Sequence, residues 1–123
     1  MTKILVVDDR KDHRTWIADV LRLEGYDVVE AESGQKALDL LAQGGVDLIT
    51  LDELMPSMSG MKCYERIHQD EQLQGIPVIF ITVLGQDRRF VELRRQGVRV
   101  LTKPLSYREI AKAVASALEQ GRG

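Results

Sequence analysis

The sequence lacks most of the residue types that disulfides, soft-metal sites and membrane spans require. It has one cysteine and two histidines in 123 residues, which rules out an internal disulfide and leaves too few donors for a zinc site. No stretch is long and apolar enough for a signal peptide or a membrane span. The formal net charge of -2 provides no broad attraction to nucleic acid or to an anionic membrane. We therefore expect a cytoplasmic domain that binds neither nucleic acid nor membrane directly.

Short apolar runs alternate with helical patterns along the whole chain. Strand-like runs are predicted at residues 3–7, 26–31, 48–51, 78–81 and 98–102, and helices at 11–23, 35–43, from 61 onward, 85–96 and 106–119. This alternation predicts an α/β fold, a doubly wound five-stranded parallel sheet with five helices and the flavodoxin-like order 2-1-3-4-5. Residues 1–121 are expected to form one domain, with 122–123 as a frayed tail.

Four side chains carry specific structural expectations. Trp16 is expected on the inward stripe of the first helix, and His13, near the start of that helix, is expected to be solvated. Cys63 is expected to be a packing residue, because nothing nearby in the sequence would activate its thiol. In the fourth helix, Arg94 interrupts the inward face that includes Phe90. Either Arg94 snorkels to solvent, or this helix is marginally stable until it meets an acidic partner or a second copy.

The residues that follow four of the predicted strands form one candidate site. Asp8 and Asp9 follow the first, Asp52 the third, Thr82 the fourth and Lys103 the fifth. The carboxyl ends of parallel strands share one sheet edge, where ligands bind, so these side chains should meet. Three carboxylates repel one another unless a cation joins them, and an all-oxygen site suits Mg²⁺. An Asp can also form an acyl phosphate, whose oxygens Thr82 and Lys103 could bind. Each residue alone is commonplace, and the conjunction is the specific signal.

These residues lie in motifs that resemble the receiver domain of two-component response regulators over essentially the whole chain. The matching segments are residues 6–9 with Arg14, 33–38, 47–48, 52–56 with Gly60, 77–82 and 102–104, the last similar to the family's cis Lys-Pro bond. The resemblance implies a phosphorylation-switched signalling domain of a phosphorelay, in which Asp52 accepts a phosphoryl group from a sensor histidine kinase or a phosphotransfer protein. Such a domain is not an enzyme for other substrates, because it catalyses only its own phosphorylation and dephosphorylation.

The resemblance also implies a cofactor and its ligands. Mg²⁺ would be held by Asp8, Asp9, Asp52 and the backbone carbonyl of Leu54. Thr82 and Lys103 would bind the phosphoryl oxygens.

The segments that carry the signal outward in this family depart from its usual pattern. Val83 stands where the family commonly has a small residue, and Val100 stands where an aromatic residue commonly changes rotamer on activation. We therefore expect an atypical output face, with Thr82, Val83, Phe90 and Val100 as its switch residues. An output domain, a partner protein or a second copy would bind the face formed by the fourth helix, fifth strand and fifth helix.

Two leucines are expected to set the lifetime of the phosphorylated state. In this fold, the residues two beyond the acceptor Asp and two beyond the Thr flank the approach of the hydrolytic water, and here they are Leu54 and Leu84. Neither can orient a water, so the acyl phosphate should be long-lived.

Three other functions remain open. One is an unphosphorylated interaction module on the receiver fold. A hydrolase of the haloacid dehalogenase type would have its nucleophile after the first strand and a second Asp two residues on, whereas here Leu54 follows Asp52 at that spacing. A flavodoxin-like FMN protein would have a Gly- and hydroxyl-rich phosphate loop after the first strand, where this chain has acidic and basic residues at 8–12.

Overall fold

The computed structural model describes residues 1–121, so the tail expected at 122–123 lies outside the described residues. The strands are β1 (Lys3–Val7), β2 (Asp27–Ala31), β3 (Leu48–Leu51), β4 (Val78–Thr82) and β5 (Arg99–Thr102). The helices are α1 (Lys11–Leu23), α2 (Gly34–Leu41), α3 (Gly60–Gln69), the 3₁₀ turn η1 (Arg88–Phe90), α4 (Val91–Arg95) and α5 (Tyr107–Gly121). All strand pairs are parallel, in the order β2-β1-β3-β4-β5. The predicted topology is confirmed.

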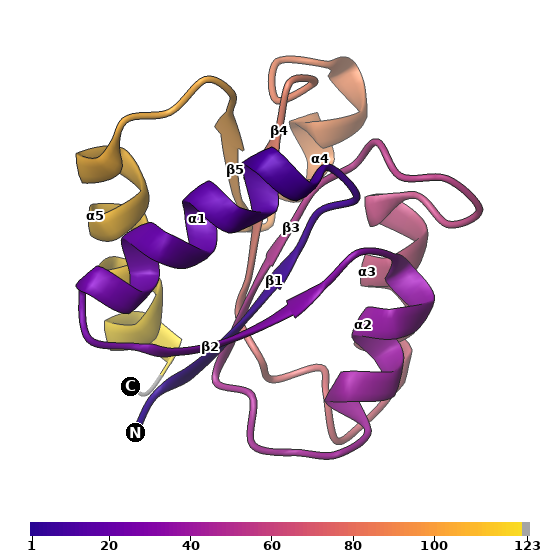
Figure 1. Cartoon of the computed structure of the whole chain (residues 1–123). Helices are drawn as coiled ribbons and strands as arrows, with labels where there is room; N and C mark the ends of the chain where they lie inside the picture. Colours follow the sequence, from indigo (N-terminus) through magenta and orange to yellow (C-terminus); the bar gives the residue numbers. More distant parts are fainter. Residues whose placement is uncertain (122–123) are drawn as a thin grey trace.

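Helices cover both faces of the sheet. Figure 1 shows α1 and α5 on one face and α2, α3 and α4 on the other. Successive residues of β1 serve the two faces, because Ile4 and Val6 pack with the first group of helices and Leu5 and Val7 with the second. Both faces of the central strands are therefore dry, which explains why these strands are continuous apolar runs. Among the described helices, none combines the length and the apolar character needed to cross a membrane.

Helix α1 has the predicted bounds, but Trp16 does not lie where the sequence suggested. The buried stripe consists of Ile17, Ala18, Val20 and Leu21, whereas Trp16 is 44% exposed. On a wheel of about 100° per residue, Trp16 lies about 120° from the centre of that stripe. The prediction that Trp16 faces inward is therefore wrong, and its ring instead lines a surface pocket.

The fourth helical segment is much shorter than the predicted 85–96. Residues 84–87 form a turn closed by a hydrogen bond from the Asp87 N–H to the Leu84 carbonyl (2.8 Å). Gly85 is packed so closely on β5 that a Cβ there would collide with the side chain of Thr102. The helical residues begin only after Asp87, whose carboxylate accepts from the Arg89 N–H (3.0 Å). They end before Gly97, which has a φ of +93°.

The basic residue inside this short helix has a specific partner. Arg94 donates from Nη2 to the carbonyl oxygen of Val100 on β5 (3.0 Å), while Phe90 and Leu93 provide the buried contacts. Arg94 is exposed, and its bond to the β5 main chain keeps the guanidinium charge outside the apolar contacts. Whether the helix is also marginally stable is a prediction that hydrogen exchange tests.

Candidate functional site

The carboxyl ends of β1 and β3 bring three aspartates together. Register pairs Val7 with Leu51 across these strands, so the residues that follow, Asp8 and Asp52, emerge side by side. One carboxylate oxygen from each of Asp8, Asp9 and Asp52 lies within 4.8 Å of the others. Asp8 is 1% and Asp52 6% exposed. Burial raises the pKa of Asp8 above its usual value, although hydrogen bonds from Lys103 and from the Arg10 N–H work in the opposite direction.

Lys103 connects this cluster to the ends of β4 and β5. Its Nζ donates to Asp8 Oδ2 (2.7 Å) and to Asp52 Oδ2 (3.2 Å). Its backbone N–H donates to the Thr82 carbonyl at the end of β4 (3.0 Å), which fixes the start of the β5–α5 loop. One ammonium group faces three carboxylates, so the cluster keeps an excess of negative charge.

The donor set of the cluster suits a hard divalent cation. Each of the three aspartates offers a carboxylate oxygen, and oxygen is the ligand atom that Mg²⁺ prefers. Asp9 Oδ1 is buried and has no hydrogen-bond partner in the described part of the chain. A buried carboxylate oxygen without a partner is unfavourable unless a cation or water joins it. These residues therefore fit a Mg²⁺ ion.

The loop after β3 holds Asp52 in place through main-chain contacts. The Glu53 N–H donates to Asp52 Oδ1 (2.7 Å), and the Gly60 N–H donates to the Glu53 carbonyl (3.0 Å). A Cβ at position 60 would collide with the Asp52 carbonyl oxygen. Glycine at this position is therefore a steric requirement of the loop, and it lets α3 begin directly against the backbone of Asp52 and Glu53.

Thr82 ends β4 as predicted and is fully buried. Its hydroxyl oxygen accepts from the Leu84 N–H (3.2 Å). Within the described residues, this hydroxyl makes no hydrogen bond to Asp52 or to the Lys103 ammonium. The structure therefore brings Asp8, Asp9, Asp52 and Lys103 into one connected group and leaves the Thr82 side chain beside it.

Comparison with known proteins identifies this arrangement. The sequence profile described as response regulator receiver domain matches residues 4–115. The chain belongs to this family. A receiver domain is the signalling domain of two-component response regulators, and the resemblance read from the sequence motifs is confirmed.

Relatives match nearly the whole of this receiver domain, but the relatives themselves differ in length. The phosphate regulon transcriptional regulatory protein PhoB of Pseudomonas aeruginosa is 34% identical over 122 residues, which are 95% of this chain and 52% of PhoB. Protein PilH of the same species is 31% identical, with 96% of this chain and 98% of PilH covered. The solved structure of the Vibrio cholerae chemotaxis protein CheY4 has a TM-score of 0.87 and 26% identity, covering 95% of this chain and 98% of that one. The receiver domain thus spans about half of PhoB and nearly all of PilH.

The residues predicted to form the output switch lie in different environments. Val83 is exposed, whereas Phe90 and Val100 are buried in the core on the α2, α3 and α4 face. Phe90 packs against Phe80 of β4, with 5.2 Å between the ring centroids. Val100 thus occupies a packed position with no aromatic ring to rotate.

The two leucines predicted to flank the acceptor also differ in exposure. Leu54 is 49% exposed, and Leu84 is partly buried against the core. Leu84 packs against the same core cluster that contains Phe90 and Leu93.

Glu53 is a site residue that the sequence reasoning missed. Although charged, it is 4% exposed. Its Oε1 accepts from the Met61 N–H (2.7 Å), and its Oε2 pairs with Arg89 Nη1 (3.1 Å). The residue next to Asp52 is therefore tied to the start of α3 and, through Arg89, to η1. A charged residue inside an otherwise apolar segment was the available signal.

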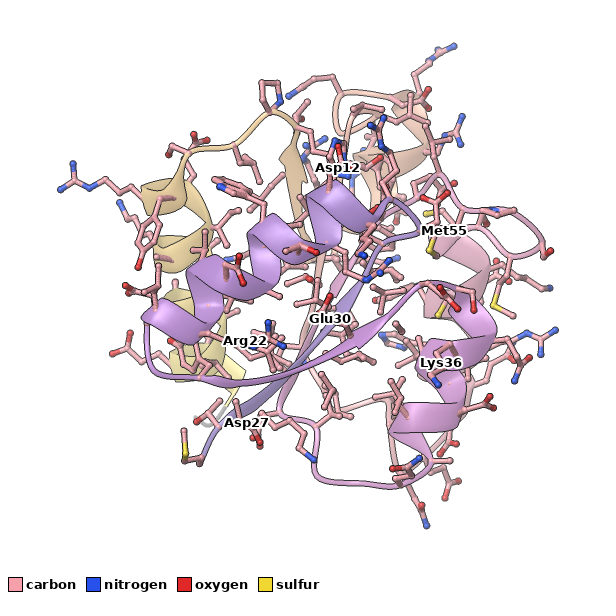
Figure 2. The ribbon with its side chains drawn as sticks, viewed as in Figure 1. Asp12, Arg22, Asp27, Glu30, Lys36 and Met55 are labelled. Carbon is pink, nitrogen blue, oxygen red and sulfur yellow. The ribbon has the colours of Figure 1, made fainter. Side chains whose placement is uncertain are left out.

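A second ionic group supports the β1 end of the site. Arg14 donates from Nη1 to the Asp8 carbonyl oxygen (2.9 Å) and from Nε to Glu30 Oε1 (3.2 Å). Arg22 reaches the other oxygen of Glu30 (3.2 Å), and Figure 2 shows Arg22 and Glu30 close together between α1 and β2. Arg14, which belongs to the motifs shared with the family, thus holds the main chain at Asp8 in place.

His13 is half-buried and makes a specific contact, whereas the sequence suggested that it would be solvated. Its Nδ1 lies 2.8 Å from Lys103 Nζ, because the first turn of α1 faces the β5–α5 loop across the site. The sequence separation of 90 residues between these two positions left no local signal for the contact.

Proposed function

We propose that Asp52 of this receiver domain accepts a phosphoryl group from the phosphohistidine of a sensor histidine kinase or a phosphotransfer protein, in the cytoplasm. One observation carries the proposal. The Asp52 carboxylate lies beside the Asp8 and Asp9 carboxylates. Its Oδ1 accepts from the Glu53 main-chain N–H, and its Oδ2 accepts from Lys103. An acceptor oxygen at this position has a cation on one side and oxygen ligands for a second cation on the other.

The chemistry is a displacement at phosphorus. A bond forms between an Asp52 carboxylate oxygen and phosphorus, and the bond from phosphorus to the donor nitrogen breaks, with its electron pair remaining on the donor imidazole. Lys103 and the Thr82 hydroxyl would bind the oxygens of the transferred group. The Glu53 N–H would hold the Asp52 carboxyl group at its attacking orientation.

Mg²⁺ is the cofactor that the acidic cluster supports. Asp8, Asp9, Asp52 and the Leu54 carbonyl would hold it, and when bound it would neutralise part of the charge on the phosphoryl oxygens. The buried, unpaired Asp9 Oδ1 is the observation on this chain that supports the assignment.

The output of the switch is proposed to leave through the face made by α4, β5 and α5, to an output domain, a partner protein or a second copy. The buried Val100 and the short η1–α4 segment support an atypical route from Thr82 to this face. Catalysis is proposed to be limited to the domain's own phosphorylation and dephosphorylation. An unphosphorylated interaction module is the second candidate, and turnover of small phosphate esters would instead indicate a hydrolase.

Labelling with a small acyl phosphate donor tests the acceptor. The wild-type protein should gain one acid-stable, base-labile phosphoryl group in a Mg²⁺-dependent reaction, and Asp52→Asn should gain none. Asp39→Asn, which changes an exposed aspartate of α2 bonded to Gln35, is the matched control and should label like the wild type. Labelling that persists in Asp52→Asn would disprove the assignment, and no labelling of the wild type would favour the interaction module.

A further inference from the structure

The Lys103 ammonium group has three hydrogen-bond acceptors, and one of them lies outside the carboxylate cluster. Its Nζ lies 2.7 Å from Asp8 Oδ2, 3.2 Å from Asp52 Oδ2 and 2.8 Å from His13 Nδ1. An ammonium group has three N–H donors and no acceptor, so these contacts use its whole donor capacity. Because Nζ can only donate, His13 Nδ1 must be the acceptor. The imidazole is then neutral, with its proton on Nε2.

Among the described residues, few groups could replace His13 as an acceptor on that side. His13 and Lys103 line a pocket of about 420 Å³ whose walls are mostly apolar, including Trp16, Val83 and Pro104. Asp12 is the one other charged residue among the described residues of the lining, and its carboxylate bonds the Arg10 guanidinium (3.2 Å). Without the His13 acceptor, the third N–H of Lys103 would turn toward water in this pocket.

We propose that His13 is a positioning residue, which orients the Lys103 ammonium for phosphoryl transfer to Asp52. The inference rests on the proposed function of Asp52. A tetrahedral ammonium with one donor fixed on His13 directs its other two donors to the side where Asp8 and Asp52 lie. The phosphoryl oxygens would enter on that same side. Small losses of orientation at a reacting centre reduce rates strongly.

This role requires the neutral form of His13. Protonation removes the acceptor lone pair at Nδ1 and places a second positive charge against Lys103. The charged groups facing His13 are Lys103, from the β5–α5 loop, and Asp12, from its own helix. The pKa of Asp12 is lowered by its hydrogen bond to Arg10, so Asp12 stays ionised at neutral pH.

Three proteins measured for the rate of labelling by the acyl phosphate donor separate these roles. His13→Leu removes the acceptor, and its labelling should be slower than that of the wild type by about tenfold. His13→Asn presents an oxygen where Nδ1 stands, and its rate should stay within about twofold of the wild type. Thermal unfolding midpoints of all three should agree.

The possible failures are distinguishable. If the wild type is labelled at Asp52 and His13→Leu keeps the same rate, the positioning role is disproved and the acceptor assignment stands. If His13→Asn is as slow as His13→Leu, the acceptor function of Nδ1 is disproved. If His13→Leu does not fold, His13→Ala, which also removes the acceptor, is measured in its place. If the wild type is not labelled, the proposed function fails and this inference fails with it.

Discussion

Both carboxylate oxygens of Asp52 have hydrogen-bond donors, whereas two exposed apolar residues follow the ends of β3 and β4. The Glu53 N–H and Lys103 bond its two oxygens, while Leu54 and Val83 are exposed nearby in their loops. Leucine and valine side chains can neither donate to nor accept from a water molecule. We therefore propose that the composition of these loops would slow hydrolysis of an acyl phosphate on Asp52.

The leucines can be tested by exchanging them for polar residues. Leu54→Asn combined with Leu84→Glu should accelerate loss of the phosphoryl group by about tenfold, because each new side chain can orient an attacking water. The decay of the phosphorylated protein after removal of the donor measures this rate. Leu23→Asn, which alters an exposed leucine at the end of α1, is the matched control. Decay that is unchanged or slower in the double variant would show that the leucines are not the barrier.

At the level of elements, α4 is the shortest α-helix in the described part of the chain. It spans five residues, too few to be stable without tertiary contacts. Those contacts are the buried Phe90 and Leu93, the bond from Arg94 to Val100, and the ion pair between Arg89 and Glu53. The last contact connects this segment to Asp52 through Arg89 and Glu53. We propose that a change at Asp52 would reach α4 along this connection.

Hydrogen exchange should reveal this link. In the resting protein, residues 85–96 should exchange quickly, and binding of beryllofluoride with Mg²⁺ as a phosphoryl mimic should slow their exchange by about tenfold or more. Arg89→Ala, which breaks the ion pair with Glu53, should weaken that slowing. Arg88→Ala removes an exposed neighbouring arginine and should not. Equal and strong protection in both states would leave α4 as a static helix with a solvated basic face.

At the scale of the whole molecule, the pattern of apolar runs was enough to predict the sheet and the edge at which the acidic cluster lies. Strands buried on both faces are contiguous in sequence, and a parallel sheet gathers their carboxyl ends, so Asp8, Asp52 and Lys103 could be placed together from their positions alone. The cis bond expected between Lys103 and Pro104 is also present.

What could not be predicted depends on contacts between distant segments. The Glu53–Arg89 and His13–Lys103 pairs join positions 36 and 90 residues apart, with no periodic signal to connect them. The exposed position of Trp16 depends on the angular limits of a buried stripe, which hydrophobicity alone does not define. The late start of the fourth helix depends on the close packing of Gly85 on Thr102.

Metal binding should stabilise the whole fold if the acidic cluster holds Mg²⁺. A ligand that binds only the folded state adds about 2.7 kcal/mol to the free energy of unfolding when its concentration is about 100 times its dissociation constant. Urea unfolding across a Mg²⁺ titration measures this gain, which a chelator should reverse. Asp9→Asn should lose most of it, and Asp39→Asn should keep it. An unfolding free energy of the wild type that does not respond to Mg²⁺ would contradict the cofactor assignment.

The most direct measurement for the acceptor is peptide mapping by mass spectrometry after incubation with the acyl phosphate donor and Mg²⁺. Trapping or low-pH digestion preserves the acyl phosphate long enough for fragmentation to locate it. We predict a single phosphoryl group on Asp52, absent when Mg²⁺ is omitted. A phosphoryl group located on Asp8, Asp9 or any residue other than Asp52 would contradict this assignment.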